Sequence, residues 1–116
     1  MFDYRKLPDE ELNYVPIGRA DELTEEEPLL IDIGGQPIAV ISSQDGLYAI
    51  DDMCSHDGGS LADGDIEDGE IICPRHGARF SLETGQALTL PAVKDIRVYP
   101  VMILDGGLQV GLPKKM

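Results

Sequence analysis

The sequence predicts an all-β domain of short antiparallel strands, and three observations support this fold class. Its apolar runs are too brief for helices. Pairs of Asp-Gly or Gly-Gly, which favour tight turns, separate these runs. The chain has 116 residues, of which 42% are hydrophobic and 27% charged, the size and balance of one globular domain. We therefore expect residues 1–116 to form a single β domain.

The expected strands are the apolar runs between these turns. They cover residues 29–33, 38–42, 47–51, 70–73 and 108–110. A further strand is expected from Ile96 and Val98 to residues 101–104, interrupted at an edge or bulge by Pro100, which has no amide hydrogen to donate. The only helical candidate is residues 20–27, which Pro28 would end. Residues 1–13 are expected to form either a flexible arm or a packed edge.

Asp-Gly pairs predict the positions of tight turns. Glycine accepts the positive φ that such turns demand, so an Asp-Gly pair between two apolar runs favours a β-hairpin. The five pairs begin at Asp45, Asp57, Asp63, Asp68 and Asp105.

The charge and hydropathy of the chain exclude two classes of partner. Nine basic and 22 acidic residues give a formal net charge of −13, which repels nucleic-acid phosphates, and a 5% aromatic content without Trp offers few rings for base stacking. No run approaches the roughly 18 apolar residues of a membrane span, and the first residues lack the apolar block of a secretion signal. We expect no nucleic-acid or membrane partner and a cytoplasmic location, where thiols stay reduced.

Acidic residues are concentrated in one stretch of the sequence. Residues 45–70 contain nine acids and neither Lys nor Arg. One interpretation is a solvated face in which aspartates serve turns; the other is an acidic collar that steers the protein toward basic partners. Arg75 and Arg79 follow this stretch and are expected to contact partners, to act on a nearby site or to be idle at the surface. The nine acids are Asp45, Asp51, Asp52, Asp57, Asp63, Asp65, Glu67, Asp68 and Glu70.

The strongest functional signal is the placement of the metal-ligating residue types. The chain has two Cys and two His, and they form the pairs Cys54-x-His56 and Cys73-x-x-His76. Glycine follows each pair, and glycine lets loop tips approach each other closely. We interpret Cys54, His56, Cys73 and His76 as candidate ligands of one centre.

Four interpretations of this cluster differ in how much they explain. Two structural cysteines with unrelated histidines would not require clustering, and a Cys54–Cys73 disulfide is disfavoured in a reducing compartment. A Cys–His nucleophile needs only one pair. A four-ligand metal site uses all four side chains. Zinc accepts two Cys and two His, whereas one Cys and one His from each loop also suit a two-iron cluster with both His on one iron.

These motifs resemble the signature of the Rieske [2Fe–2S] family. Cys-x-His, a spacer of 16 residues and Cys-x-x-His-Gly carry the resemblance, and further stretches at 49–51, 77–80, 84–85 and 90–92 extend it over residues 14–112. The whole is similar to bacterial Rieske-type ferredoxins. The resemblance implies stacked antiparallel sheets, with a [2Fe–2S] cluster held at one tip by two hairpin loops. It also implies a third, proline-containing loop over the cluster, matched by Pro91.

Departures from the family pattern carry information about the reduction potential. The high-potential respiratory members have a disulfide between the two loops, and Gly59 and Arg75 stand at the matching positions. Those members also have a Ser and a Tyr that donate hydrogen bonds to sulfur, where this chain has Ala78 and Phe80. The resemblance therefore implies a potential at the low end of the Rieske range of roughly −150 to +300 mV, outside the membrane-anchored respiratory class.

The sequence predicts an electron carrier and not an enzyme. It contains no Gly-x-Gly-x-x-Gly motif for a dinucleotide and no second cluster of ligands for a mononuclear iron. The resemblance implies a ferredoxin that passes single electrons from a flavin-dependent reductase to a terminal acceptor, a ring-hydroxylating or related non-haem iron oxygenase. Two alternatives stay open: a small Rieske-like subunit of a larger reductase, such as assimilatory nitrite reductase, and a zinc-binding structural or interaction module.

Overall fold

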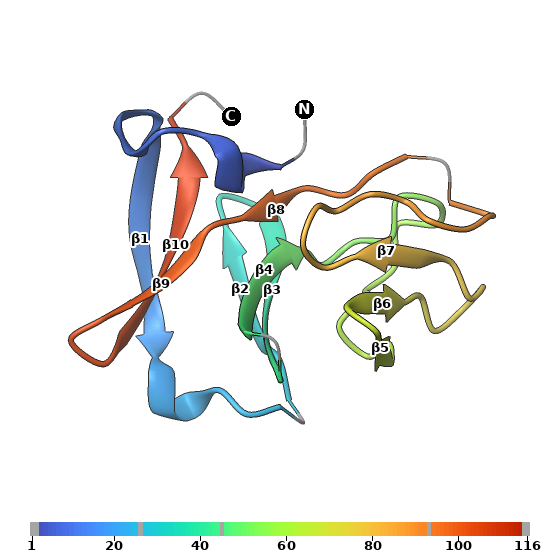
Figure 1. Cartoon of the computed structure of the whole chain (residues 1–116), viewed down its shortest axis with the longest axis horizontal. Coiled ribbons are helices and arrows are strands. Elements are labelled where there is room, and N and C mark those ends of the chain that lie inside the picture. The colour runs from blue at the N-terminus through green and yellow to red at the C-terminus, as the bar shows by residue number, and fades with distance from the viewer. Residues whose placement is uncertain (1–2, 26, 45, 93, 115–116) are drawn as a thin grey trace.

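The computed structural model describes residues 3–25, 27–44, 46–92 and 94–114, and its strands form three antiparallel sheets that follow one another across the molecule (Figure 1). The all-β prediction is confirmed: the described residues form strands, turns and three 3₁₀ turns. The 3₁₀ turns are η1 (Tyr4–Lys6), η2 (Asp9–Glu11) and η3 (Ala20–Glu22). No helix in these residues is long and apolar enough to cross a membrane.

The middle sheet has the strand order β2-β3-β4-β8. Its strand β3 is buried on both faces, because Ile38 and Val40 pack into one apolar cluster while Ala39 and Ile41 pack into the other. This double burial explains why the sequence runs as continuous apolar residues here and does not alternate. The four strands are β2 (Leu29–Ile33), β3 (Gln36–Ser43), β4 (Gly46–Asp51) and β8 (Val98–Tyr99).

The outer sheet has the order β1-β10-β9 and covers one face of the middle sheet. The expected strand around Pro100 is in fact two strands, since the chain leaves the middle sheet at Pro100 and enters the outer sheet. Strand β1 was not predicted; Pro16 and Gly18 interrupt its pattern, and the register with β10 shifts between them. The strands are β1 (Leu12–Arg19), β9 (Val101–Leu104) and β10 (Gly107–Pro113).

The third sheet, of order β5-β6-β7, is made of very short strands: β5 (Ile66–Glu67), β6 (Glu70–Ile72) and β7 (Arg79–Ser81). Strands β5 and β7 were not predicted from the sequence. Two predicted Asp-Gly hairpins are confirmed: Asp68 joins β5 to β6 and Asp105 joins β9 to β10, each with φ of 52° and with a positive φ at the following glycine. Asp45 of another pair lies outside the described residues.

The helix expected over residues 20–27 is wrong. Only Ala20–Glu22 turns, as a single 3₁₀ turn, and Glu26 lies outside the described residues. The segment has only Ala20 and Leu23 as apolar side chains, so a helix here would have no apolar stripe to bury.

Residues 3–13 contact the rest of the fold at several points. Asp3 bridges Val98, and the rings of Tyr4 and Tyr99 lie 5.4 Å apart. Strand β1 then begins at Leu12 and pairs with β10.

Candidate metal centre

The four candidate ligands lie on two loops that begin where strands end. The first ligand loop, residues 54–59, follows β4, and the second ligand loop, residues 73–78, connects β6 to β7. The two loops close with the same backbone hydrogen bonds. The amide of Cys54 donates to the carbonyl of Gly59 at 2.7 Å, as the amide of Cys73 donates to that of Ala78 at 2.7 Å.

A glycine at the same offset allows each loop to turn back. The amides of Gly58 and Gly77 donate to the carbonyl oxygens of Cys54 and Cys73, at 2.8 and 3.0 Å. Both glycines have φ of 75°, a conformation that other residues adopt only at a cost. The glycines that follow each Cys–His pair therefore build the loops themselves.

The two thiols are free, buried and close together. Cys54 and Cys73 are each 1% exposed, and their sulfurs lie within 4.8 Å of each other. They belong to an apolar cluster that includes Leu61 and Phe80. Burial raises the pKa of the Cys54 thiol, so a metal binding there must displace a proton.

The two imidazoles lie at the surface beside the buried sulfurs. His56 and His76 are exposed, and their ring centroids are 5.2 Å apart with the planes nearly perpendicular. The side chain of His76 is 51% exposed. The structure thus brings all four predicted residues to one tip, with the sulfurs inside and the rings outside.

An ion pair that the sequence did not predict connects the two loops. Asp57 of the first loop accepts hydrogen bonds from Arg75 Nε at 2.7 Å and from Arg75 Nη2 at 3.0 Å. The guanidinium and the amide of Gly59 hold the pKa of Asp57 well below its usual range. Asp57 Oδ2 also lies 3.1 Å from His76 Nδ1. The only sequence signal for this contact is that each charged residue adjoins a candidate ligand.

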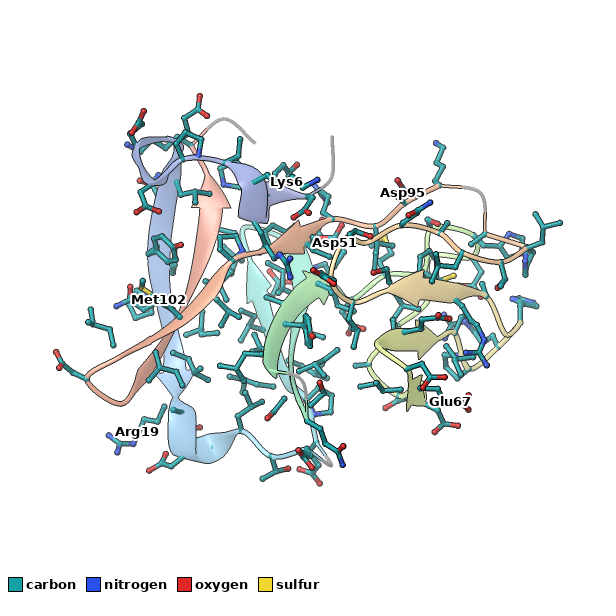
Figure 2. The ribbon with its side chains drawn as sticks, in the orientation of Figure 1. Lys6, Arg19, Asp51, Glu67, Asp95 and Met102 are labelled. Atoms are coloured by element: carbon teal, nitrogen blue, oxygen red, sulfur yellow. The ribbon has the colours of Figure 1, made fainter. Side chains whose placement is uncertain are left out.

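Side chains at the start of the first loop anchor it to the middle sheet. Asp51 ends β4 and accepts hydrogen bonds from Tyr99 Oη at 2.6 Å and from Arg97 Nε at 2.8 Å. Burial and the neighbouring Asp51 raise the pKa of Tyr99, so it stays a protonated donor. Figure 2 shows Asp51 between the middle sheet and the sheet that carries the second loop.

Asp52 organises the chain that leaves the first loop. Its Oδ1 accepts from the Leu61 amide at 2.8 Å, the Ala62 amide at 2.9 Å and Ser60 Oγ at 2.8 Å. Three donors on one carboxylate hold residues 60–62, which follow the loop in the sequence, in place.

A third segment meets the first loop. Ser55 Oγ donates to the carbonyl oxygen of Lys94 at 2.5 Å. Pro91, which the family resemblance singles out, and the exposed Leu90 lie three and four positions before Lys94 in the sequence.

The acidic stretch is partly neutralised. Asp51 and Asp57 pair with Arg97 and Arg75, and Arg79 pairs with Glu67 and Glu70 at 3.4 Å (Figure 2 labels Glu67). Arg75 and Arg79 are therefore not idle. The acidic collar stays a prediction, based on exposed acids such as Asp63, Asp65 and Asp68.

The chemistry of this donor set suits an iron–sulfur centre. Two free thiols in an apolar setting and two surface imidazoles, presented by matched loops, are the ligand types of a two-iron cluster with histidines on one iron. The same donors would also satisfy zinc.

Comparisons with known proteins distinguish these possibilities. Residues 13–100 match the Rieske [2Fe-2S] domain family. The anthranilate 1,2-dioxygenase ferredoxin subunit of Burkholderia cepacia is 40% identical over 97 residues, 84% of this chain and 90% of that protein.

Two of the solved structures with the same fold are ferredoxins of carbazole 1,9a-dioxygenase. The ferredoxin of carbazole 1,9a-dioxygenase from Nocardioides aromaticivorans superimposes with a TM-score of 0.75 at 34% identity, covering 86% of this chain and 99% of that one. A ferredoxin in a complex of reduced oxygenase and oxidised ferredoxin of carbazole 1,9a-dioxygenase gives 0.77 at 28% identity, covering 89% and 96%. On the family match, the close relative and the shared fold, this chain belongs to the Rieske [2Fe–2S] family.

Proposed function

We propose that this protein is the ferredoxin component of a multicomponent non-haem iron oxygenase, a one-electron carrier and not itself a catalyst. The observation that carries the proposal is the convergence of two buried thiols and two exposed imidazoles on matched loops, in a chain of Rieske fold. The relative from Burkholderia cepacia, a dioxygenase ferredoxin subunit, supports it.

In this proposal Cys54 and Cys73 bind one iron, and His56 and His76 bind the other. When bound, the cluster accepts and releases one electron at a time. Two thiolates and two neutral imidazoles leave the oxidised centre without net charge, whereas four thiolates would leave it doubly negative and harder to reduce. The choice of ligands therefore favours electron acceptance.

Some of the surrounding residues shield the sulfurs from water, and others leave the imidazole rings open to a partner protein. Ala78 and Phe80 are fully buried beside the cysteines and keep water from the sulfurs, but they offer no hydroxyl to them. Their apolar character supports a potential at the low end of the Rieske range. The exposed rings of His56 and His76 give a partner protein direct contact with the ligands.

We propose two transient partners. A flavin-dependent reductase supplies electrons, since the chain has no dinucleotide motif of its own. A ring-hydroxylating or related oxygenase receives them, and the complex of a similar ferredoxin with its oxygenase supports this choice. We place the protein in the reducing cytoplasm, where thiols stay available for iron.

The test is reconstitution with defined components. Anaerobically purified protein should contain two irons and two sulfides per chain, absorb in the visible, and give a two-iron paramagnetic signal after dithionite. Mixed with the reductase and oxygenase of the anthranilate system, it should restore electron flow to the oxygenase. Colourless protein loaded with zinc would contradict the proposal. Stable co-purification with a large reductase would instead indicate a fixed accessory subunit.

A further inference from the structure

The two ligand loops meet without a covalent bond between them. Gly59 closes the first loop by accepting from the Cys54 amide, and Arg75 lies within the second loop. These positions do face each other: a Cβ built on Gly59 would collide with the guanidinium of Arg75. The arginine side chain thus fills the space between the loops, and the absence of a side chain at Gly59 makes room for it.

Arg75 uses this position to contact both loops. From the second loop it reaches Asp57 with two nitrogens, at 2.7 and 3.0 Å, and its Nη1 donates to the carbonyl oxygen of Ser60 at 2.8 Å. Its Nη2 also lies 3.3 Å from the Sγ of Cys73. One guanidinium therefore joins the first loop, at Asp57, and the residue that follows it, Ser60, to a candidate ligand of the second loop.

The geometry distinguishes this contact from an ordinary surface ion pair. Exposed pairs contribute little because water screens them. Both residues lie at the surface, but the Asp57 side chain is only 17% exposed, the pair is bidentate, and the same guanidinium also donates to a backbone carbonyl and to a sulfur. An N–H donor at the sulfur stabilises negative charge there, which favours the reduced form of a cluster.

We infer that Arg75 is a positioning residue: it links the loops through Asp57 and Ser60 and donates to the sulfur of Cys73. It holds the cluster in place and raises its reduction potential. The inference rests on the proposed function for the cluster, but the link between the loops is a property of the protein itself.

The main experiment compares Arg75→Gln with Arg79→Gln. Both remove one positive charge close to the second loop, but Arg79 pairs with Glu67 and Glu70 and not across the loops. We expect Arg75→Gln to release its iron to a chelator about 10–100-fold faster than wild type. Its equilibrium constant for reduction should fall about tenfold, which is about 59 mV for one electron. Arg79→Gln should match wild type in both measurements.

Two further variants separate the link from the sulfur contact. Arg75→Lys keeps the charge but loses the planar fork, so it should release iron faster with a smaller fall in potential. Asp57→Asn weakens the link while leaving Arg75 in place, so it should release iron faster with no fall in potential. These variants also serve if Arg75→Gln fails to assemble a cluster.

The outcomes distinguish this inference from the proposed function. Wild-type protein with a two-iron spectrum, together with Arg75→Gln equal to wild type in both iron release and potential, would overturn the inference alone. Wild-type protein without iron would refute the proposed function. In that case the link is measured by a double-mutant cycle of Arg75→Gln and Asp57→Asn on thermal unfolding. Non-additive effects would support it, and additive effects would overturn it.

Discussion

The two ligand loops have the same backbone conformation and differ in the side chains that they carry. Each closes with the same pair of hydrogen bonds and turns at a glycine with φ of 75°. Two residues after its cysteine the first loop has His56 and the second has Arg75; three residues after, they have Asp57 and His76. Across the gap His56 meets His76, and Asp57 meets Arg75.

This crossed arrangement shows how one loop design can serve two purposes. Position two of the first loop and position three of the second, counted from each cysteine, carry the two imidazole rings that face each other. Position three of the first loop and position two of the second carry the ion pair. One facing pair is suited to bind metal, and the other pair connects the loops. Both loops have the same backbone geometry, and their side chains differ in role: one facing pair can bind metal and the other holds the loops together.

The loops also differ in their support. The second loop is the connection of a hairpin, between β6 and β7. The first loop has a strand only before it, and its exit depends on the carboxylate of Asp52. Hydrogen bonds to the Asp52 carboxylate thus take the place of a strand on one side of the site.

The largest expected effect is the loss of the cluster when either ring is removed. His56→Ser and His76→Ser should each abolish the native two-iron signal, because in the proposed cluster each loop supplies one nitrogen ligand. Electron paramagnetic resonance of dithionite-reduced protein measures this. A native signal in either variant would show that the two loops are not equivalent in ligation.

A smaller effect is expected from Asp52→Ala, which tests the difference in support. The change removes the carboxylate that accepts from two backbone amides and a hydroxyl, and it should lower the free energy of unfolding by about 1–3 kcal/mol. Amide hydrogen exchange should accelerate at Cys54 and Gly58 but not at Cys73 and Gly77. The control is Asp65→Ala, an exposed acid in the same stretch. Equal acceleration in both loops would contradict the asymmetry.

Glycine substitutions test the shared backbone. Gly58→Ala and Gly77→Ala should each cost about 1–2 kcal/mol in chemical denaturation, because both sites have a positive φ and open space around the added Cβ. Gly69→Ala, also at φ 75° with open space, should cost the same. Only the two loop variants should bind the cluster less tightly. A loss of stability in only one of the two loop variants would show that the two loops do not depend on the same backbone conformation.

The smallest expected effect is on the reduction potential. Ala78→Ser adds a hydroxyl at a fully buried position at the end of the second loop and should raise the midpoint potential by hydrogen bonding to sulfur. Ala62→Ser, at a partly buried position that packs on the same apolar cluster, should leave the potential unchanged. Protein-film voltammetry compares the two. An unchanged potential in Ala78→Ser would refute the assigned role of this position.

Much of the fold could be predicted because it depends on local chemistry. Apolar runs predicted the strands of the middle sheet, and Asp-Gly pairs predicted the hairpins at Asp68 and Asp105, since both signals act within a few residues. Strands β1, β5 and β7 were missed because their pairing partners, and not their own residues, stabilise them. The helix expected over residues 20–27 was wrong because propensity without an apolar stripe does not stabilise a helix.

The sequence by itself predicted a soft-metal centre from the identity and spacing of Cys54, His56, Cys73 and His76, and it left zinc and a two-iron cluster both open. Only the tertiary structure decided which side chains face each other across the gap. Asp57 and Arg75 are 18 positions apart along the chain, and no local signal pairs them. Their contact exists because the sheets bring two loop tips together, and at that distance charge and hydrogen bonding act strongly.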